Sequence, residues 1–229
     1  MKSKTLNVVV FTFIIISSIY MLIFFNIPIF LTWLTTVFGI LASKFASEGK
    51  WSTFVFDIFS YIIYIYICLK EHYFGEMILS YIVILCHLYG IMEWNKNKTN
   101  DIVKINIINK KEHLVVTLIS IISFILYLIF LSKINSNFAF INAISTISFL
   151  IGNYFSYRRS IFQFYFWNIY EIFYIILWLI PALHGDIEKI LLLLGATLEL
   201  FYNISGIKIW KSNIKILKEK INIQSISYN

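Results

Sequence analysis

Long apolar runs separated by short polar breaks are the feature that most restricts the fold of this 229-residue chain. A helix needs roughly 20 mainly apolar residues to cross the hydrocarbon core of a bilayer. Only helices and closed barrels satisfy their backbone polar groups in hydrocarbon, and long runs without alternation favour helices. The eight spans that we predict are Leu6–Phe25, Phe30–Ala46, Phe54–Leu69, Glu76–Trp94, His113–Leu131, Phe138–Tyr157, Gln163–Leu179 and Ile187–Trp210. We therefore expect an all-α membrane protein, with one long kinked helix through Asn26 and Pro28 as the alternative at the first boundary.

The composition agrees with a lipid environment and argues against other classes of protein. Only 14% of the residues are charged, whereas a soluble domain has about 25%. The net charge of +7 is spread over the short breaks, so the bilayer is the expected partner and nucleic acid is not. Cys68 and Cys86 lie inside predicted spans without a CxxC pair, and the four His are scattered. We expect no metal, no cofactor and no enzyme, since HExxH and GxSxG motifs are also absent.

The Lys and Arg residues predict the orientation of the spans. If the N-terminus is cytoplasmic and eight spans alternate in direction, every Lys and Arg residue except Lys70, Lys133 and Lys189 falls on the cytoplasmic side. This asymmetry follows the positive-inside rule, so both termini are predicted to be cytoplasmic. The first apolar run reaches Phe25, which is too long for a cleaved signal peptide, and we expect it to be retained as a helix.

A short motif occurs at the end of both halves of the chain. The fourth span ends with Gly90-x-x-x-Trp94 and the eighth with Gly206-x-x-x-Trp210. Two parallel three-helix units joined by one extra helix would produce this pattern, which transporters use, although chance is the alternative because Gly and interfacial Trp are common in membranes. The predicted units are an extra N-terminal transmembrane helix (1–28), a first three-helix bundle (29–95), a cytoplasmic loop and linker helix (96–135), a second three-helix bundle (136–211) and a cytoplasmic tail (212–229).

Polar residues inside the spans mark the candidate site. Ionisable groups are costly in hydrocarbon, so each one is a functional candidate, and five helices carry a polar or aromatic face at helical spacing. Glu171 is near the middle of its span between Trp167 and Tyr174, an environment that suits a cationic or hydroxyl-rich ligand. The candidate substrate-binding residues are Trp167, Glu171, Ser60, Tyr64, His87, Asn203, Ser80, Asn142 and Tyr174.

Alternative interpretations remain for several polar residues. Ser60 is a candidate for simple hydrogen bonding between helices, at about 0.6 kcal/mol. His87 is a candidate packing histidine, and Asp57 and Glu76 are candidates for solvated groups near the membrane interface.

Several of these motifs resemble the PnuC family of bacterial nicotinamide riboside and related vitamin transporters. Tyr89–Trp94 resembles the family's Tyr-Gly-Trp-x-x-Trp without its middle Trp, and Lys70–Glu76 resembles the tyrosine-rich link ahead of that helix. Asn142–Thr146 resembles the Asp-Ala-x-Thr-Thr segment, and Arg158 with Arg159 resembles the basic pair that follows it.

The presumed ligand shell departs from the family pattern. Gln163 and Trp167 match the beginning of the next span, where the family has Trp-x-x-x-Asn, and Glu171 stands in place of the Asn. Ser60 and His87 stand where the family has Asn and Gln.

The resemblance covers about Phe38 to Trp210 and implies both a fold and a function. It implies a SWEET-like core of three, one and three helices in a bacterial plasma membrane. It also implies facilitated diffusion of nicotinamide riboside by alternating access, with thiamine or another nucleoside-like vitamin as the alternative substrate. A non-transporting membrane protein, such as an immunity or assembly factor, is the other open hypothesis, and a homo-oligomer is left open as well.

Overall fold

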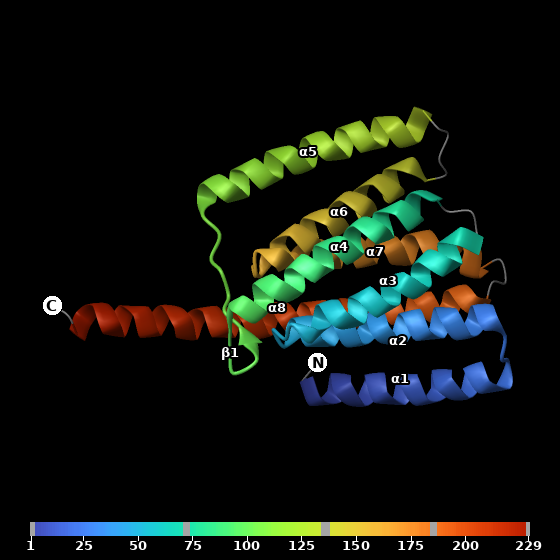
Figure 1. The fold of residues 1–229 in the computed structure, drawn as a ribbon, viewed down its shortest axis with the longest axis horizontal. Coiled ribbons are helices and arrows are strands. Elements are labelled where there is room, and N and C mark those ends of the chain that lie inside the picture. The colour runs from blue at the N-terminus through green and yellow to red at the C-terminus, as the bar shows by residue number, and fades with distance from the viewer. Residues whose placement is uncertain (1–2, 71–73, 134–137, 184–186, 228–229) are drawn as a thin grey trace.

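The computed structural model describes residues 3–70, 74–133, 138–183 and 187–227, which form eight helices and a small hairpin (Figure 1). The helices are α1 (Ser3–Ile23), α2 (Ile27–Ser47), α3 (Ser52–Lys70), α4 (Phe74–Lys96), α5 (Lys110–Lys133), α6 (Ala139–Tyr157), α7 (Phe162–Leu183) and α8 (Ile187–Ser227). Strands β1 (Lys98–Thr99) and β2 (Ile102–Val103) pair antiparallel between α4 and α5. The predicted all-helical class and the eight helices are confirmed. The hairpin falls in a segment that we predicted only as a polar break.

Five helices of the described chain are long and apolar enough to cross a bilayer. They cover Lys4–Ile23, Ile27–Ser47, Lys110–Lys133, Ala139–Tyr157 and Ile190–Leu217. Large apolar side chains such as Leu22, Leu85 and Leu126 are exposed on the outside of the bundle. Exposed apolar surface of this extent is unfavourable in water and is covered by lipid in a membrane. The chain is therefore a multi-pass membrane protein.

The boundary between α1 and α2 is a break between two helices. Asn26 has an extended backbone, with φ −141° and ψ 161°, and its Oδ1 accepts a hydrogen bond from the backbone N–H of Ile29 at 2.7 Å. Asn26 is therefore the N-cap of α2. Pro28 lies in the first turn, where backbone N–H groups have no partner within the helix, so the missing N–H of proline costs no hydrogen bond. The alternative of one kinked helix is therefore wrong.

Helix α8 is longer than predicted. We expected the last span to end at Trp210, but the helix continues without interruption to Ser227, and Figure 1 shows this part extending beyond the other helices. Ile207, Trp210, Ile214 and Leu217 keep a helical spacing, and no Gly or Pro follows Gly206 to end the helix. The segment after 212 is therefore helical as far as residue 227.

The helices pack as two groups of three with one additional helix beside each group. α3 packs against α2 and α4, and α7 packs against α6 and α8. The two groups meet where α2 contacts α8 and where α4 contacts α6. α5 packs on α6, and α1 packs on α2 and α8, so α1 lies outside the two groups of three helices.

The α2–α3 and α6–α7 turns have the same backbone hydrogen bonds, position for position. In the first turn, the N–H groups of Glu48, Gly49 and Lys50 donate to the carbonyls of Lys44, Ala46 and Phe45. In the second turn, those of Arg158, Arg159 and Ser160 donate to the carbonyls of Tyr154, Ser156 and Phe155. Gly49 and Arg159 are both left-handed, with φ of 73° and 55°. The two turns are thus the same local structure built from different sequences.

The segment between the halves is hydrogen-bonded to both turns. The N–H of Val103 donates to the carbonyl of Gly49 at 2.9 Å, and the N–H of Asn106 donates to that of Arg159 at 3.0 Å. This linker therefore holds the two turns at one end of the bundle, where Figure 1 also places the beginning of α1 and the extension of α8.

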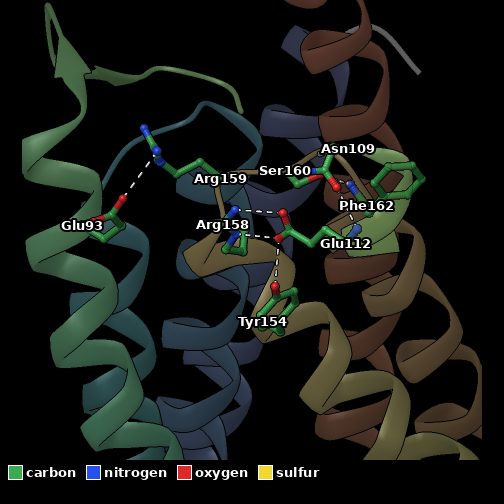
Figure 2. Close-up of polar contacts among 8 residues, drawn as sticks. All are labelled: Glu93, Asn109, Glu112, Tyr154, Arg158, Arg159, Ser160 and Phe162. Carbon is green, nitrogen blue, oxygen red and sulfur yellow. Dashed lines mark hydrogen bonds and ion pairs between the residues drawn. The ribbon is translucent and has the colours of Figure 1, made fainter. Parts of the chain in front are cut away.

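Ion pairs reinforce the second turn (Figure 2). The Glu112 carboxylate, at the beginning of α5, accepts hydrogen bonds from Arg158 Nε at 2.7 Å and Nη2 at 2.9 Å, and from the Tyr154 hydroxyl at 2.8 Å. Arg159 Nη2 lies 3.4 Å from Glu93 Oε1 of α4. The basic pair singled out in the sequence therefore connects the α6–α7 turn to α5 and to the first group of helices.

The Gly-x-x-x-Trp motif of α4 packs around an aromatic ring. Phe54 and Trp94 meet edge to face, with centroids 5.1 Å apart, and a Cβ at Gly90 would lie 2.7 Å from Phe54 Cε1. Trp94 is fully buried, and its Nε1 donates to the carbonyl of Ser156 at 2.8 Å. The glycine is required because the ring occupies the space of its side chain.

The motif of α8 is built in the same way. Phe164 and Trp210 meet edge to face at 5.3 Å, and a Cβ at Gly206 would lie 2.6 Å from Phe164 Cε1. The indoles of Trp94 and Trp210 contact each other, with centroids 6.0 Å apart. The two copies of the motif therefore form one aromatic cluster that joins the two groups of helices.

Candidate functional site

Two glutamates on neighbouring helices meet in the interior of the helical bundle. Glu171 of α7 is only 4% exposed, and Glu199 of the neighbouring helix α8 lies close enough for the two carboxyl groups to interact. Ser43 Oγ of α2 donates to Glu199 Oε2 at 3.3 Å. A Cβ at Gly39 would lie 2.6 Å from Glu199 Oε1, so the glycine leaves room for the carboxyl. The carboxyl pair therefore lies where α2, α7 and α8 come together.

A histidine links three other helices close to this pair. His87 of α4 is 1% exposed, with Nε2 3.2 Å from Asp57 Oδ2 of α3 and Nδ1 3.0 Å from the Tyr157 hydroxyl of α6. A carboxylate only accepts, so Nε2 donates to Asp57, while Nδ1 shares a hydrogen bond with the Tyr157 hydroxyl. The charge of Asp57 acts on both Glu171 and Glu199. The histidine network and the carboxyl pair therefore form one polar region across both groups of helices.

Aromatic rings adjoin the polar region. On α7, Tyr170 contacts Tyr174 at 5.4 Å between centroids, and Tyr174 contacts Trp178 at 5.9 Å. Phe149 of α6 contacts Tyr170 at 4.9 Å and Tyr61 of α3 at 6.1 Å. Rings next to buried carboxyl groups attract an organic cation by cation–π interaction, which is stronger when the groups are desolvated.

Buried amide groups provide hydrogen-bonding capacity that the described protein does not use. Asn203 of α8 is 1% exposed, and its Oδ1 has no hydrogen-bond partner among the described residues. The same is true of Asn168 Oδ1 on α7. Buried polar atoms are nearly always paired in native proteins, so these oxygens are available to the donors of a ligand.

The predicted residues fall into two sets in the structure. Glu171 and His87 belong to the polar region, and Tyr174 belongs to the aromatic rings beside it. Tyr64 of α3 lies close enough to Tyr170 for the two side chains to interact electrostatically. The Trp167 indole packs directly on Gly152 of α6.

The second set consists of Ser60, Ser80 and Asn142, which are buried or half-buried in α3, α4 and α6. The Ser60 hydroxyl donates to the backbone carbonyl of Thr35 at 3.2 Å, which is a contact between helices α2 and α3. Ser80 is buried in α4, and Asn142 is half-buried in the first turn of α6. Their roles in binding stay predictions. The side chain of Glu76 and the link at 71–73 lie outside the described residues.

Sequence reasoning left Glu199, Asp57 and Tyr170 out of the candidate set. Glu199 shares a helix face with Asn203, and Asp57 is three and four residues before Ser60 and Tyr61. The helical spacing of these polar residues therefore indicated both Glu199 and Asp57 as candidates. Among the described residues, no three His, Cys, Asp or Glu side chains gather as metal ligands.

This architecture, with ionisable groups buried between two groups of helices, is that of a multi-pass membrane transporter. Residues 29–213 match the nicotinamide mononucleotide transporter family, and the chain belongs to that family. The match confirms the resemblance found in the sequence and places the chain among transporters and not among enzymes.

Two relatives support this assignment. The chain is 23% identical to the nicotinamide riboside transporter PnuC of Neisseria mucosa over 198 residues, which cover 83% of this chain and 75% of the relative. The crystal structure of the vitamin B3 transporter PnuC matches with a TM-score of 0.77 at 22% identity, covering 94% of each chain. The fold is therefore shared along nearly the whole length.

Proposed function

We propose that this protein carries a small cationic vitamin, nicotinamide riboside, across the bacterial plasma membrane by facilitated diffusion with alternating access. The observation that carries the proposal is the buried carboxyl pair of Glu171 and Glu199. Nicotinamide riboside joins a pyridinium cation to a ribose, so it offers a positive charge to the carboxyls, a flat ring to Tyr170 and Tyr174, and hydroxyl donors to Asn203. The named function of the PnuC relative agrees with this chemistry.

The same chemistry admits one alternative substrate class. Thiamine carries a thiazolium cation and a hydroxyl group, so it fits the carboxyls and the rings by the same interactions. A non-transporting membrane protein would have no use for an ionisable pair that is costly to bury, which favours transport over an immunity or assembly role.

The proposed architecture is a SWEET-like core in which residues 29–95 and 136–211 are parallel three-helix repeats. The two equivalent turns and the two Gly-x-x-x-Trp clusters support the repeat. We propose that all eight helices span the membrane, with 1–28 as an extra helix and 96–135 as loop and linker helix. Both termini are cytoplasmic in this proposal, because the basic turns and the linker lie at the end where α1 begins.

Counterflow in proteoliposomes tests the proposed function. Vesicles loaded with unlabelled nicotinamide riboside are expected to accumulate labelled nicotinamide riboside transiently, because a carrier exchanges solute across the membrane. The uncharged dihydronicotinamide riboside, which has nearly the same shape, is expected to compete poorly because it lacks the pyridinium charge. If folded protein gives no counterflow with nicotinamide riboside, thiamine, riboflavin or deoxynucleosides, the proposed function is wrong.

A further inference from the structure

Arg158 and Arg159 are consecutive residues of the α6–α7 turn, yet they bind to different parts of the protein. Arg158 Nε lies 2.7 Å from Glu112 Oε1, at the beginning of α5. Arg159 Nη2 lies 3.4 Å from Glu93 Oε1, near the end of α4. Figure 2 shows the two side chains pointing in different directions from the turn, in which Arg159 is left-handed. One arginine therefore binds the helix beside its own group, and the other reaches across to the first group of helices.

Helix α5 is fixed to the second group of helices at this end. Glu112 holds its arginine through both carboxylate oxygens and also accepts from the Tyr154 hydroxyl at 2.8 Å. The ring of His113 meets that of Phe162 edge to face, with centroids 4.3 Å apart. A bidentate pair of arginine and carboxylate has a fixed geometry and is stronger than a single contact. We therefore expect α5 to move together with α6, α7 and α8 as one body.

Arg159 belongs to a set of contacts between the two groups of helices. Trp94 Nε1 of α4 donates to the carbonyl of Ser156 at 2.8 Å, three residues before Arg159. The Asn97 amide donates to Glu93 Oε1 at 2.9 Å, on the same oxygen that lies near Arg159. The side chains of Arg159 and Glu93 are only 16% and 24% exposed, so water and salt screen this ion pair less than a fully exposed one. These contacts hold the end of α4 against the end of α6.

The linker between the halves limits how far the two turns can separate. The N–H of Val103 donates to the carbonyl of Gly49, and the N–H of Asn106 donates to that of Arg159. Three residues of extended chain span at most about 10 Å. Separation of the turns beyond this reach must break one of these two hydrogen bonds.

We propose that Glu93 and Arg159 form a lock that closes the cytoplasmic end of the carrier and opens in each transport cycle, and that Glu112 and Arg158 form a clamp that stays closed. This inference rests on the proposed function, because alternating access requires the two groups of helices to part at each end in turn. Movement of α4 away from α6 breaks the lock and the bond of Trp94 to the Ser156 carbonyl. The clamp stays intact, because both of its residues belong to one moving body.

Reversible cross-linking distinguishes the lock from the clamp. In a chain whose two native cysteines are replaced with serine, one variant carries Glu93→Cys with Arg159→Cys, and its matched control carries Glu112→Cys with Arg158→Cys. A short bis-methanethiosulfonate reagent links each pair, and mass spectrometry confirms the link. Linking positions 93 and 159 is expected to lower counterflow of nicotinamide riboside by about tenfold or more, because the groups no longer part. Reduction of the link restores it, and linking positions 112 and 158 is expected to change counterflow by less than about twofold.

Access from the cytoplasmic side gives a second measurement, which does not depend on a cross-link. Ser156 is fully buried, and its hydroxyl has no hydrogen-bond partner among the described residues, so the thiol of Ser156→Cys reports opening of this end. A charged thiol reagent added to inside-out vesicles is expected to label this thiol about fivefold faster when Arg159→Gln removes the ion pair. The control Glu112→Gln, which removes the clamp, is expected to leave the labelling rate within about twofold of its parent.

The outcomes separate this inference from the proposed function. If counterflow persists after positions 93 and 159 are linked, or if Arg159→Gln leaves labelling unchanged, the lock does not open during transport and the inference is wrong, while the transport proposal stands. If linking positions 112 and 158 also stops counterflow, α5 is not part of the moving body and the assignment of the clamp is wrong. If folded wild-type protein gives no counterflow with any of the candidate substrates, both proposals fail.

Discussion

Replacing Glu171 with alanine is expected to abolish saturable uptake of nicotinamide riboside while the protein still inserts and folds in the membrane. Glu171 is buried between helices close to Glu199, so the variant loses half of the carboxyl pair that attracts the cation. Removing one partner of a buried charged interaction costs about 2–5 kcal/mol, and we expect the apparent affinity to fall by about 100-fold or more. Initial uptake rates over a range of substrate concentrations, normalised to the folded protein in the vesicles, measure the effect.

The matched control is Glu219→Ala, which removes a carboxylate from the exposed end of α8. Its uptake is expected to equal that of wild type, because Glu219 is remote from the described site. Wild-type uptake by folded Glu171→Ala would remove Glu171 from the substrate site.

Replacing Trp94 with alanine is expected to cause the largest loss of stability. The indole is fully buried against Phe54 and Trp210 and donates a hydrogen bond to the carbonyl of Ser156. Truncating a large buried aromatic residue costs about 3–5 kcal/mol, and the carbonyl also loses its donor. Because the cluster joins the two groups of helices, we expect a clear drop in the midpoint of thermal unfolding in detergent.

Met92→Ala is the matched control on the same helix, since Met92 is 63% exposed on the outer surface. Its unfolding midpoint is expected to stay close to that of wild type, because the side chain loses few protein contacts. Equal midpoints for Trp94→Ala and Met92→Ala would contradict the account of the aromatic cluster.

Most of the helical architecture was predictable because the lengths of apolar runs reflect the thickness of the bilayer. The length of α8 was not predicted. Beyond Trp210 the chain is rich in Lys, and we interpreted these residues as the end of a span and not as the continuation of the helix into water. The hairpin between α4 and α5 was also missed. Its turn depends on Asn100 and Asp101 in left-handed conformations, and neither residue belongs to a pattern of apolar residues.

The site was predictable only in part, because helical periodicity gives the face of each helix but not the contacts between helices. The depth of Glu171 in an apolar span identified it as a functional candidate. Glu199 is at a similar depth in the next span and was detectable in the same way, but its proximity to Glu171 could not be predicted, since it depends on the rotation and register of α7 against α8. The simpler interpretation of Ser60 holds in the structure, where its hydroxyl donates to a backbone carbonyl of the neighbouring helix.

The repeat illustrates the same limit. The motifs at Gly90 and Gly206 indicated two equivalent halves. The turns at Gly49 and Arg159 are also equivalent in conformation, but their residue types differ, so the sequence did not show this equivalence. A left-handed residue that is not glycine is uncommon, so nothing in the local sequence indicated this conformation at Arg159.

A structure of the protein determined with nicotinamide riboside bound in a lipid environment tests the central claim most directly. We predict that the pyridinium ring lies against Tyr170 or Tyr174 of α7, with its positive charge in contact with the carboxyls of Glu171 and Glu199. A ligand bound away from both glutamates would contradict the account.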